Sequence, residues 1–248
     1  MDGYTLRIAA SGAGLSFEPE GRRQAADLAY PHSSHPAAGF LRPLPKAPKR
    51  VGLAMILRHE ELDEAIAAIL PCRGRFADAV MVIDAPVAPE FERDGVRVLA
   101  RPLAGDFAAQ RNFAQAQLRT PWALQLDADE SVGEDFLDRI NGLTAVADRQ
   151  RLVSLGLRRR NLVDGVLTDL WPDIQYRLNR RELPYSGIVH ERPALGSAWR
   201  RSTIIIRGAI DHRLNGDRVR ARAVAYEAMR PGAGRDADTA ALLRPYRD

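Results

Sequence analysis

The chain has 248 residues, of which 46% are hydrophobic and 27% are charged, and this composition excludes a disordered or fibrous protein. Its formal charge is +4 with a pI of about 9.6, which fits phosphorylated ligands, nucleic acid or an anionic lipid surface without choosing among them. No apolar run reaches the ~18 residues of a transmembrane helix, so none is expected.

The basic side chains are almost all arginine. Lys46 and Lys49 are the only lysines, so 34 of the 36 basic residues are arginine. Arginine forks suit phosphates and carboxylates, and a GC-rich genome would produce the same bias. The single cysteine, Cys72, excludes an internal disulfide and fits a reducing compartment. The N-terminus has an early acid and too short an apolar stretch for a secretory signal, so we expect a cytoplasmic protein.

Three regions follow one another along the chain. Residues 1–48 are rich in Gly, Ala, Pro, His and Ser and end in the proline-spaced basic segment RPLPKAPKR, which predicts an N-terminal extension and linker. Residues 49–215 carry the alternating pattern of a folded domain. Residues 216–248 predict a C-terminal helix, at 217–230, and a polar, loosely held tail from 231.

Strands and helices alternate through the first part of the domain. Asp106 is placed to cap one of these helices. Because the strands are short apolar runs, they predict an α/β fold, with a Rossmann-like, mostly parallel sheet and helices on both faces. Strand-length runs occupy 51–57, 79–86, 96–100 and 122–126, helical patterns occupy 60–70, 107–118 and 134–143, and later strands are expected at 152–159 and 202–210.

Concentrated acid follows the fourth strand, in the segment WALQLDADE (122–130). Asp127 and Asp129 project to the same side of an extended chain. Two carboxylates held so close repel each other unless one is protonated or a cation binds. Mg²⁺ or Mn²⁺, with positions left open for a diphosphate, is the natural cation. A solvated loop or the cap of the following helix would produce the same pair of acids.

Further polar residues converge on the same sheet edge. Asp84 ends the second strand, and ligands of open α/β sheets bind beyond the carboxyl ends of the strands. Gln110, Arg111 and Asn112 lie on the helix before the acidic strand, where they can donate to a phosphate or to the edge of a base.

Seven segments then occur in a fixed order: AMILRHEE (54–61), FADAVMVID (76–84), DFAAQRNFAQAQ (106–117), WALQLDADE (122–130), PDIQYRLNRR (172–181), SGIVHE (186–191) and IDH (210–212). Together they resemble the GT-A glycosyltransferases of family 2, and within them the branch that includes lipopolysaccharide-core glucosyltransferases. The resemblance covers roughly residues 51–213. It implies the GT-A fold, a nucleotide-sugar donor, a divalent Mn or Mg ion and a saccharide acceptor.

The resemblance also implies roles on the donor side. Asp84 matches the nucleotide-binding acid at the end of the second strand, and Arg111 and Asn112 fall where the family contacts the nucleotide or its diphosphate. Asp127 and Asp129 match the DxD motif. Asp127 would contact the ribose, and Asp129 would bind the metal.

On the acceptor side, Glu191 falls at the position of the family's catalytic base, and His212 at that of a C-terminal histidine on the metal. Asp173, Arg177 and His190 are further candidates for acceptor or phosphate contacts. One carboxylate opposite the leaving group implies a single displacement with inversion. Glu191 could instead be a simple ion-pair partner of its basic neighbours, and His212 could be a surface residue.

Two loops depart from the family pattern. The second strand of the family continues into a Gly-Ser-Thr-Asp turn, whereas this chain reads VIDAPVAPEF, and the family's Asn-Glu-Glu is His59-Glu60-Glu61 here. Both loops line the nucleotide pocket, so the departures leave the base, the sugar and activity itself open. The acceptor expected from the resemblance is a lipid-linked or cell-envelope glycan of a bacterium, with peripheral contact at the inner face of an anionic membrane.

Three other functions compete with this interpretation. A degenerate GT-A protein would bind nucleotide without activity. A nucleotidyltransferase shares the α/β plan, but LRHEELDE replaces the Gly-rich basic loop that such enzymes carry after the first strand. An RNA-binding protein would use LRRRN (157–161) and RVRAR (218–222), but these stretches lack interleaved aromatic residues, so no nucleic-acid partner is expected.

Overall fold

The computed structural model describes residues 43–187, 191–229 and 236–247. Most of the expected N-terminal extension, residues 1–42, therefore lies outside the described part. The end of the predicted linker, up to Arg50, forms no helix or strand. It runs against α5 (Glu134–Arg149), where Leu44 and Pro45 approach so closely that Gly142 has no room for a side chain.

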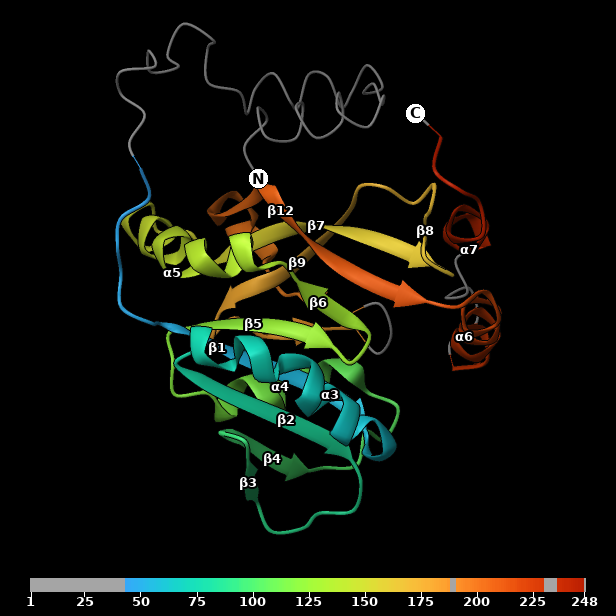
Figure 1. Cartoon of the computed structure of the whole chain (residues 1–248), viewed down its shortest axis with the longest axis horizontal. Helices are drawn as coiled ribbons and strands as arrows, with labels where there is room; N and C mark the ends of the chain where they lie inside the picture. Colours follow the sequence, from blue (N-terminus) through green and yellow to red (C-terminus); the bar gives the residue numbers. More distant parts are fainter. Residues whose placement is uncertain (1–42, 188–190, 230–235, 248) are drawn as a thin grey trace, which may run out of the picture.

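A ten-stranded mixed sheet forms the centre of the protein (Figure 1). Its order is β3-β4-β2-β1-β5-β9-β7-β12-β6, with β8 paired to β7. The strands are β1 (Val51–Arg58), β2 (Asp78–Asp84), β3 (Phe91–Arg93), β4 (Val96–Ala100), β5 (Trp122–Asp127), β6 (Glu130–Val132), β7 (Ser154–Val163), β8 (Val166–Leu167), β9 (Asp173–Arg180) and β12 (Ser202–Leu214), while β10 (Tyr185–Ser186) and β11 (Arg192–Pro193) form a separate pair.

Most of the long strands run in one direction. The pairs β4–β2, β2–β1 and β1–β5 are parallel. β9 is antiparallel to both β5 and β7, so β7 and its parallel partner β12 run the same way as β5. The carboxyl ends of β1, β2, β5, β7 and β12 therefore lie along one edge of the sheet, which is where ligands of α/β proteins bind.

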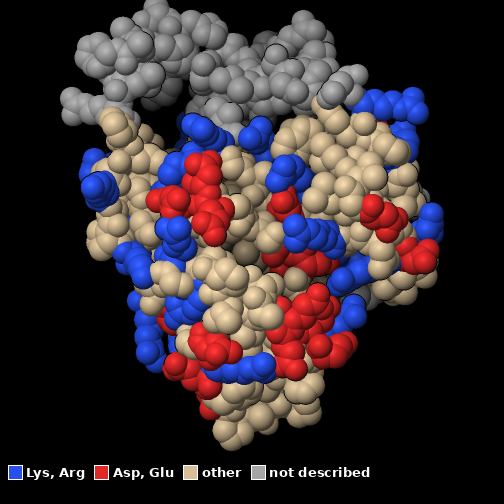
Figure 2. All heavy atoms as spheres, in the orientation of Figure 1, with Lys and Arg blue, Asp and Glu red and all other residues tan. Residues whose placement is uncertain are grey.

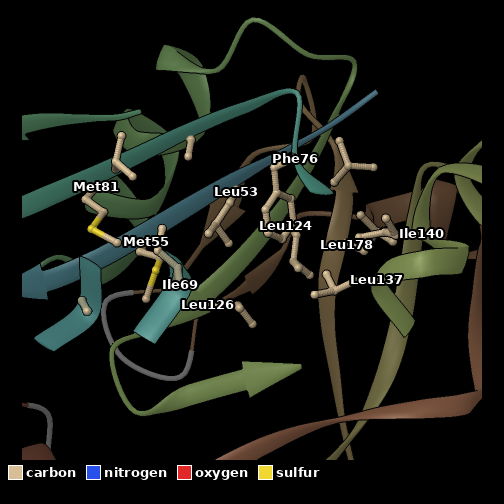
Figure 3. Close-up of a cluster of buried hydrophobic side chains, with 14 of the residues drawn as sticks. Leu53, Met55, Ile69, Phe76, Met81, Leu124, Leu126, Leu137, Ile140 and Leu178 are labelled. Atoms are coloured by element: carbon tan, nitrogen blue, oxygen red, sulfur yellow. The ribbon is translucent and has the colours of Figure 1, made fainter. Parts of the chain in front are cut away.

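Helices cover both faces of the sheet, as the sequence predicts. Alternate β1 residues point to opposite faces. Leu53 belongs to a large core cluster with Ile66 of α3 (Leu62–Ile69) and Ile140 of α5, and Figure 3 shows part of this cluster. Ala54 belongs to a smaller cluster with α4 (Phe107–Gln117) on the other face. The prediction of an α/β fold with a mostly parallel sheet covered on both faces is confirmed.

The predicted elements of the first part of the domain are confirmed with small shifts. Asp106 caps α4 by accepting a hydrogen bond from the backbone N–H of Ala109 at 2.9 Å. α5 continues to Arg149, beyond the predicted end at 143, because Thr144 and Ala147 extend its buried face. Short 3-10 helices lie at His59–Glu61, Leu70–Arg75 and Gly196–Arg201.

One long strand, β9, and part of the tail differ from the prediction. β9 was not expected as a strand, because its buried side chains include Arg177 and Asn179 rather than an apolar run. The expected loosely held tail is wrong for residues 244–246. There the backbone N–H of Asp169 donates to Arg244 at 2.8 Å, and that of Tyr246 donates to Leu167 at 2.9 Å.

The C-terminal helices stand beside the carboxyl ends of β7 and β12 (Figure 1). α6 (Gly216–Met229) follows β12 directly and confirms the predicted helix, and α7 (Asp236–Leu242) packs against α6. Across residues 43–187, 191–229 and 236–247, every helix is too short or too polar to span a bilayer.

A glycine in β1 gives a direct test of the packing between the sheet and α4. A Cβ added at Gly52 would lie 2.6 Å from Thr120 Oγ1 and 2.7 Å from Leu118 Cδ2. We expect Gly52→Ala to lower the free energy of unfolding by about 1–3 kcal/mol through overpacking, measured by urea denaturation. Gly74→Ala, where a Cβ meets nothing within 4 Å, is the control and should change stability far less.

Candidate active site

A cleft of about 660 Å³ opens at the carboxyl edge of the sheet. Its floor is formed by the ends of β1, β2 and β5, and its other walls by β9, β12 and the helices α6 and α7. The cleft brings together eight of the ten predicted site residues, including the predicted base: Asp84, Arg111, Asp127, Asp129, Asp173, Arg177, Glu191 and His212. Asn112 does not line the cleft, and His190 lies outside the described residues.

Asp127 ends β5 between two buried arginines. Arg111 Nη2 on α4 lies 2.5 Å from Asp127 Oδ1, and Arg177 Nη2 on β9 lies 2.7 Å from Oδ2. Burial alone would raise the pKa of Asp127, but the two guanidinium groups outweigh it and hold the pKa well below its usual value. The cations that neutralise this carboxylate are therefore protein side chains.

The ion pairs continue from Asp127 through the protein. Arg177 also approaches Glu130, whose carboxylate accepts a hydrogen bond from Arg159 Nη1 at 2.9 Å. Arg159 in turn pairs with Asp173 at 2.6 Å. With Glu191 at its other end, this buried charge network contains four carboxylates and three guanidinium groups: Glu191, Arg111, Asp127, Arg177, Glu130, Arg159 and Asp173.

Asp129 lies on the turn between β5 and β6, apart from the partners of Asp127. Because residues 128–129 form a turn, the extended geometry expected for the acid pair is not kept. β6 pairs with β12 so that Glu130 is opposite His212, and the backbone N–H of Arg213 donates to the Asp129 carbonyl at 2.9 Å. The turn thereby places Asp129 Oδ2 at 3.5 Å from His212 Nε2.

The hydrogen bonds of His212 leave its Nε2 directed at Asp129. Its Nδ1 lies 2.7 Å from Asn161 Oδ1, while the Asn161 amide nitrogen donates to Leu170 and Asp173. Nδ1 is thus the donor, which fixes the tautomer of the ring. Asp129 Oδ2 is buried without a hydrogen-bond partner, and Arg218 and Arg222 of α6 reach it only through longer ionic contacts of 3.4 and 3.6 Å. Because this oxygen and Nε2 are both acceptors in this tautomer, a proton or a metal ion fits between them.

The residues present fit a divalent metal ion with few protein ligands. Within the described part of the chain, no group of three or more His, Cys, Asp and Glu side chains is arranged to hold a metal. Asp129 and His212 alone would supply one oxygen and one nitrogen. Mg²⁺ commonly takes one or two carboxylates and completes its shell with water and substrate phosphates. Contact with His212 and the charge of Arg222 also lower the pKa of Asp129 against the effect of burial, which keeps this ligand ionised.

Glu191 is positioned by Arg111. Arg111 Nε lies 2.5 Å from Glu191 Oε1, so one guanidinium group holds both Glu191 and Asp127. Arg111 is only 3% exposed. The resemblance implies that Arg111 contacts the nucleotide or its diphosphate. In the structure its buried guanidinium group instead orients two carboxylates, and little of it is accessible to a diphosphate.

Asn112 holds the chain segment that leads to Glu191. Its side chain donates to the Tyr185 carbonyl at 2.9 Å and accepts from the Tyr185 backbone N–H at 2.7 Å. Tyr185 is buried, which raises the pKa of its phenol to about 12. Asn112 therefore acts on the backbone of β10, while Asp84 remains exposed at the cleft and accepts from the Leu103 N–H at 2.8 Å.

Arg177 and Asp173 line the cleft, but both are occupied within the buried charge network. The sequence did not predict that Glu130 and Arg159 belong to the buried charge network. It also did not predict that Arg218 and Arg222 of α6 line the cleft. The signal for the last pair was their spacing of four residues, which puts two side chains on one face of a helix.

Because the pKa of Asp127 is lowered in the folded protein, the free energy of unfolding should depend on pH through this carboxylate. The contribution of this carboxylate is fully present above its unfolded-state pKa of about 4 and is lost as the pH falls toward the lower folded-state value. We expect Asp127→Asn to lower the free energy of unfolding by about 3–5 kcal/mol at pH 7, because Arg111 and Arg177 lose their shared partner.

Chemical denaturation at pH 7 and below pH 4 checks this prediction. The wild type should lose more stability than the variant between these pH values. Asp63→Asn, at a carboxylate whose side chain is 82% exposed, is the control and should change stability little. Equal pH dependence in wild type and Asp127→Asn would contradict the assignment.

No family model matches the chain. It is 24% identical over 116 residues to an uncharacterized glycosyltransferase of Rickettsia bellii (strain RML369-C), a match that covers 44% of this chain. The chain is similar to a glycosyltransferase. It spans only 38% of the length of this glycosyltransferase relative.

Solved structures of S. aureus TarS are more distant. The TarS 1–349 complex with UDP-GlcNAc has a TM-score of 0.45 at 12% identity, covering 78% of this chain and 70% of that one. The complex with UDP has a TM-score of 0.42 at 13% identity.

Proposed function

We propose that the protein is an inverting, metal-dependent glycosyltransferase of the GT-A fold and of family 2. It moves a hexose from a nucleotide-sugar donor to a saccharide acceptor, for which a lipid-linked or cell-envelope glycan such as a lipopolysaccharide core fits the resemblance. Peripheral contact with an anionic membrane belongs to the same proposal. The observation that carries it is the pairing of Asp129 with His212 beside Glu191 in one cleft.

Glu191 acts as the base in this mechanism. An acceptor hydroxyl is too weak an acid to attack at neutral pH, so a carboxylate must take its proton during attack, which contributes roughly 10²- to 10⁴-fold. Arg111 and, behind it, Asp127 hold Glu191 in place. The proton moves from the acceptor oxygen to Glu191 as that oxygen bonds to the sugar carbon and the bond to the nucleoside diphosphate breaks.

Asp129 and His212 would hold the divalent ion, which when bound neutralises charge on the leaving diphosphate. Asp84 would bind the nucleoside, and its exposure in the lining of the cleft at the end of β2 supports this role. The loop after Asp84 lacks the family's Gly-Ser-Thr-Asp turn, so a degenerate protein that binds the nucleotide without transfer is the second candidate.

The surface gives little support to a nucleic-acid partner. On the face drawn in Figure 2, Lys and Arg side chains are interspersed with Asp and Glu rather than gathered in one basic stripe. Many arginines of the described part pair with carboxylates, among them Arg160 with Asp211 and Arg159 with Asp173. The segment 157–161, which competed as an RNA-binding stretch, is thereby partly neutralised.

Thermal unfolding with a panel of nucleoside diphosphates and nucleotide sugars tests the proposal. Each ligand is added with Mn²⁺, with Mg²⁺ or with EDTA, because a ligand of the native state raises stability in proportion to ln(1 + [L]/Kd). The expected result is a metal-dependent shift with one nucleotide. A shift in EDTA equal to that in Mn²⁺ would remove the metal from the proposal, and no shift with any nucleotide would overturn it.

A further inference from the structure

Two arginines of α6 lie over the proposed metal ligand. Arg218 Nη2 is 3.4 Å and Arg222 Nη1 is 3.6 Å from Asp129 Oδ2. Arg218 also reaches Glu61 Oε1, at 3.5 Å, on the far side of the cleft beyond the end of β1. The C-terminal helix therefore brings two positive charges to the position where the carboxyl ends of β1 and β5 meet.

The periodicity of α6 explains which arginines face the cleft. Arg218 and Arg222 are four residues apart, so they share a helix face, and Val219 between them is buried against the same side. Arg220 belongs to the same RVRAR segment but lies outside the cleft, pairs with Asp217 and is 63% exposed. The basic segment is thus divided by the helix into an inward pair and an outward residue.

The inward pair is more exposed and more loosely held on Asp129 than the buried arginines are on their carboxylates. The Arg218 and Arg222 side chains are 35% and 34% exposed, and their contacts with Asp129 are longer than hydrogen bonds. Arg111 and Arg177 are 3% and 7% exposed and each is held between two carboxylates at short distance.

Charge balance also requires cations beyond the buried charge network. That network has one more carboxylate than guanidinium group. Four further carboxylates line the cleft, and the other two lining arginines offset only half of them: Glu61, Asp84, Asp129 and Asp238, with Arg58 and Arg192. A diphosphate entering such a cleft would be repelled unless mobile cations met it. Guanidinium forks bind phosphate oxygens in pairs.

We propose that Arg218 and Arg222 bind the diphosphate of the donor and of the leaving group. This inference rests on the proposed function. Without ligand the two side chains neutralise Asp129. With a divalent ion on that carboxylate, the two guanidinium groups would be available to hold the phosphate oxygens.

Calorimetric titration with inorganic pyrophosphate in Mn²⁺ tests this inference without knowledge of the base or sugar. Arg218→Gln and Arg222→Gln should each weaken binding about tenfold, and the double variant about 100-fold. Arg220→Gln, the matched control on the outer side of the same helix, should bind as the wild type does. The dependence of binding on salt concentration should also be shallower in the double variant.

Further measurements separate the possible failures. Arg218→Lys and Arg222→Lys keep the charge, and they should bind more tightly than the glutamine variants even if glutamine disturbs α6. Unchanged binding of pyrophosphate and of the nucleoside diphosphates in a folded double variant would overturn this inference and leave the proposed function standing. Absence of binding of either ligand to the wild type would overturn both.

Discussion

Replacing Glu191 by glutamine should lower the turnover rate by roughly 10²- to 10⁴-fold while leaving nucleotide binding almost unchanged. Glutamine cannot take a proton from the acceptor. Its side-chain oxygen can still accept the hydrogen bond from Arg111 Nε, so the buried charge network should remain assembled. The rate is measured as release of nucleoside diphosphate from the donor that the thermal panel selects.

Glu60→Gln provides the control for this substitution. Glu60 lies after β1, does not line the cleft, and its side chain is 70% exposed, so its variant should turn over at the wild-type rate. A Glu191→Gln protein with wild-type turnover would show that another group takes the proton. Loss of nucleotide binding in that variant would instead show that Glu191 maintains the structure of the binding site.

Asp129→Asn should remove most of the metal dependence of nucleotide binding. The variant loses the only carboxylate that faces His212 Nε2 within the described part of the chain, and a neutral amide is a much weaker ligand for Mg²⁺ or Mn²⁺. We expect Mn²⁺ affinity, measured by calorimetry in the presence of the selected nucleoside diphosphate, to fall by at least about 100-fold. This estimate exceeds the 10- to 100-fold typical of losing an outer partner of the metal site.

Asp211→Asn is the matched control for the metal site. Asp211 precedes His212 on β12, but its carboxylate pairs with Arg160 outside the cleft. Its variant should bind Mn²⁺ as tightly as the wild type. Equal Mn²⁺ affinity in the wild type and Asp129→Asn would exclude Asp129 as a ligand.

The sequence predicts the first part of the fold well because that part follows simple patterns. The runs at 51–57 and 122–126 are apolar because they form the centre of the sheet, buried on both faces. β9 breaks the rule, since Arg177 and Asn179 are buried in it through ion pairs and hydrogen bonds. The partners of these buried polar groups include residues distant in sequence, so no local pattern marks β9 as a buried strand.

The site is predictable in its members and less so in their arrangement. The position of Asp84 and Asp127 at strand ends places both at the cleft, as expected. The turn after Asp127 and the pairing of β6 with β12 separate the two acids of the DxD motif, and neither is visible from alternation along an extended chain. The partners of Arg111, one of them 80 residues away, likewise depend on tertiary structure.

A crystal structure with Mn²⁺ and the selected nucleoside diphosphate, using the anomalous signal of manganese, tests the central claim most directly. The account predicts one manganese peak bound to Asp129 and His212, with the diphosphate between the ion and the guanidinium groups of Arg218 and Arg222. A manganese ion or nucleotide bound elsewhere, with Asp129 and His212 still facing each other alone, would contradict it.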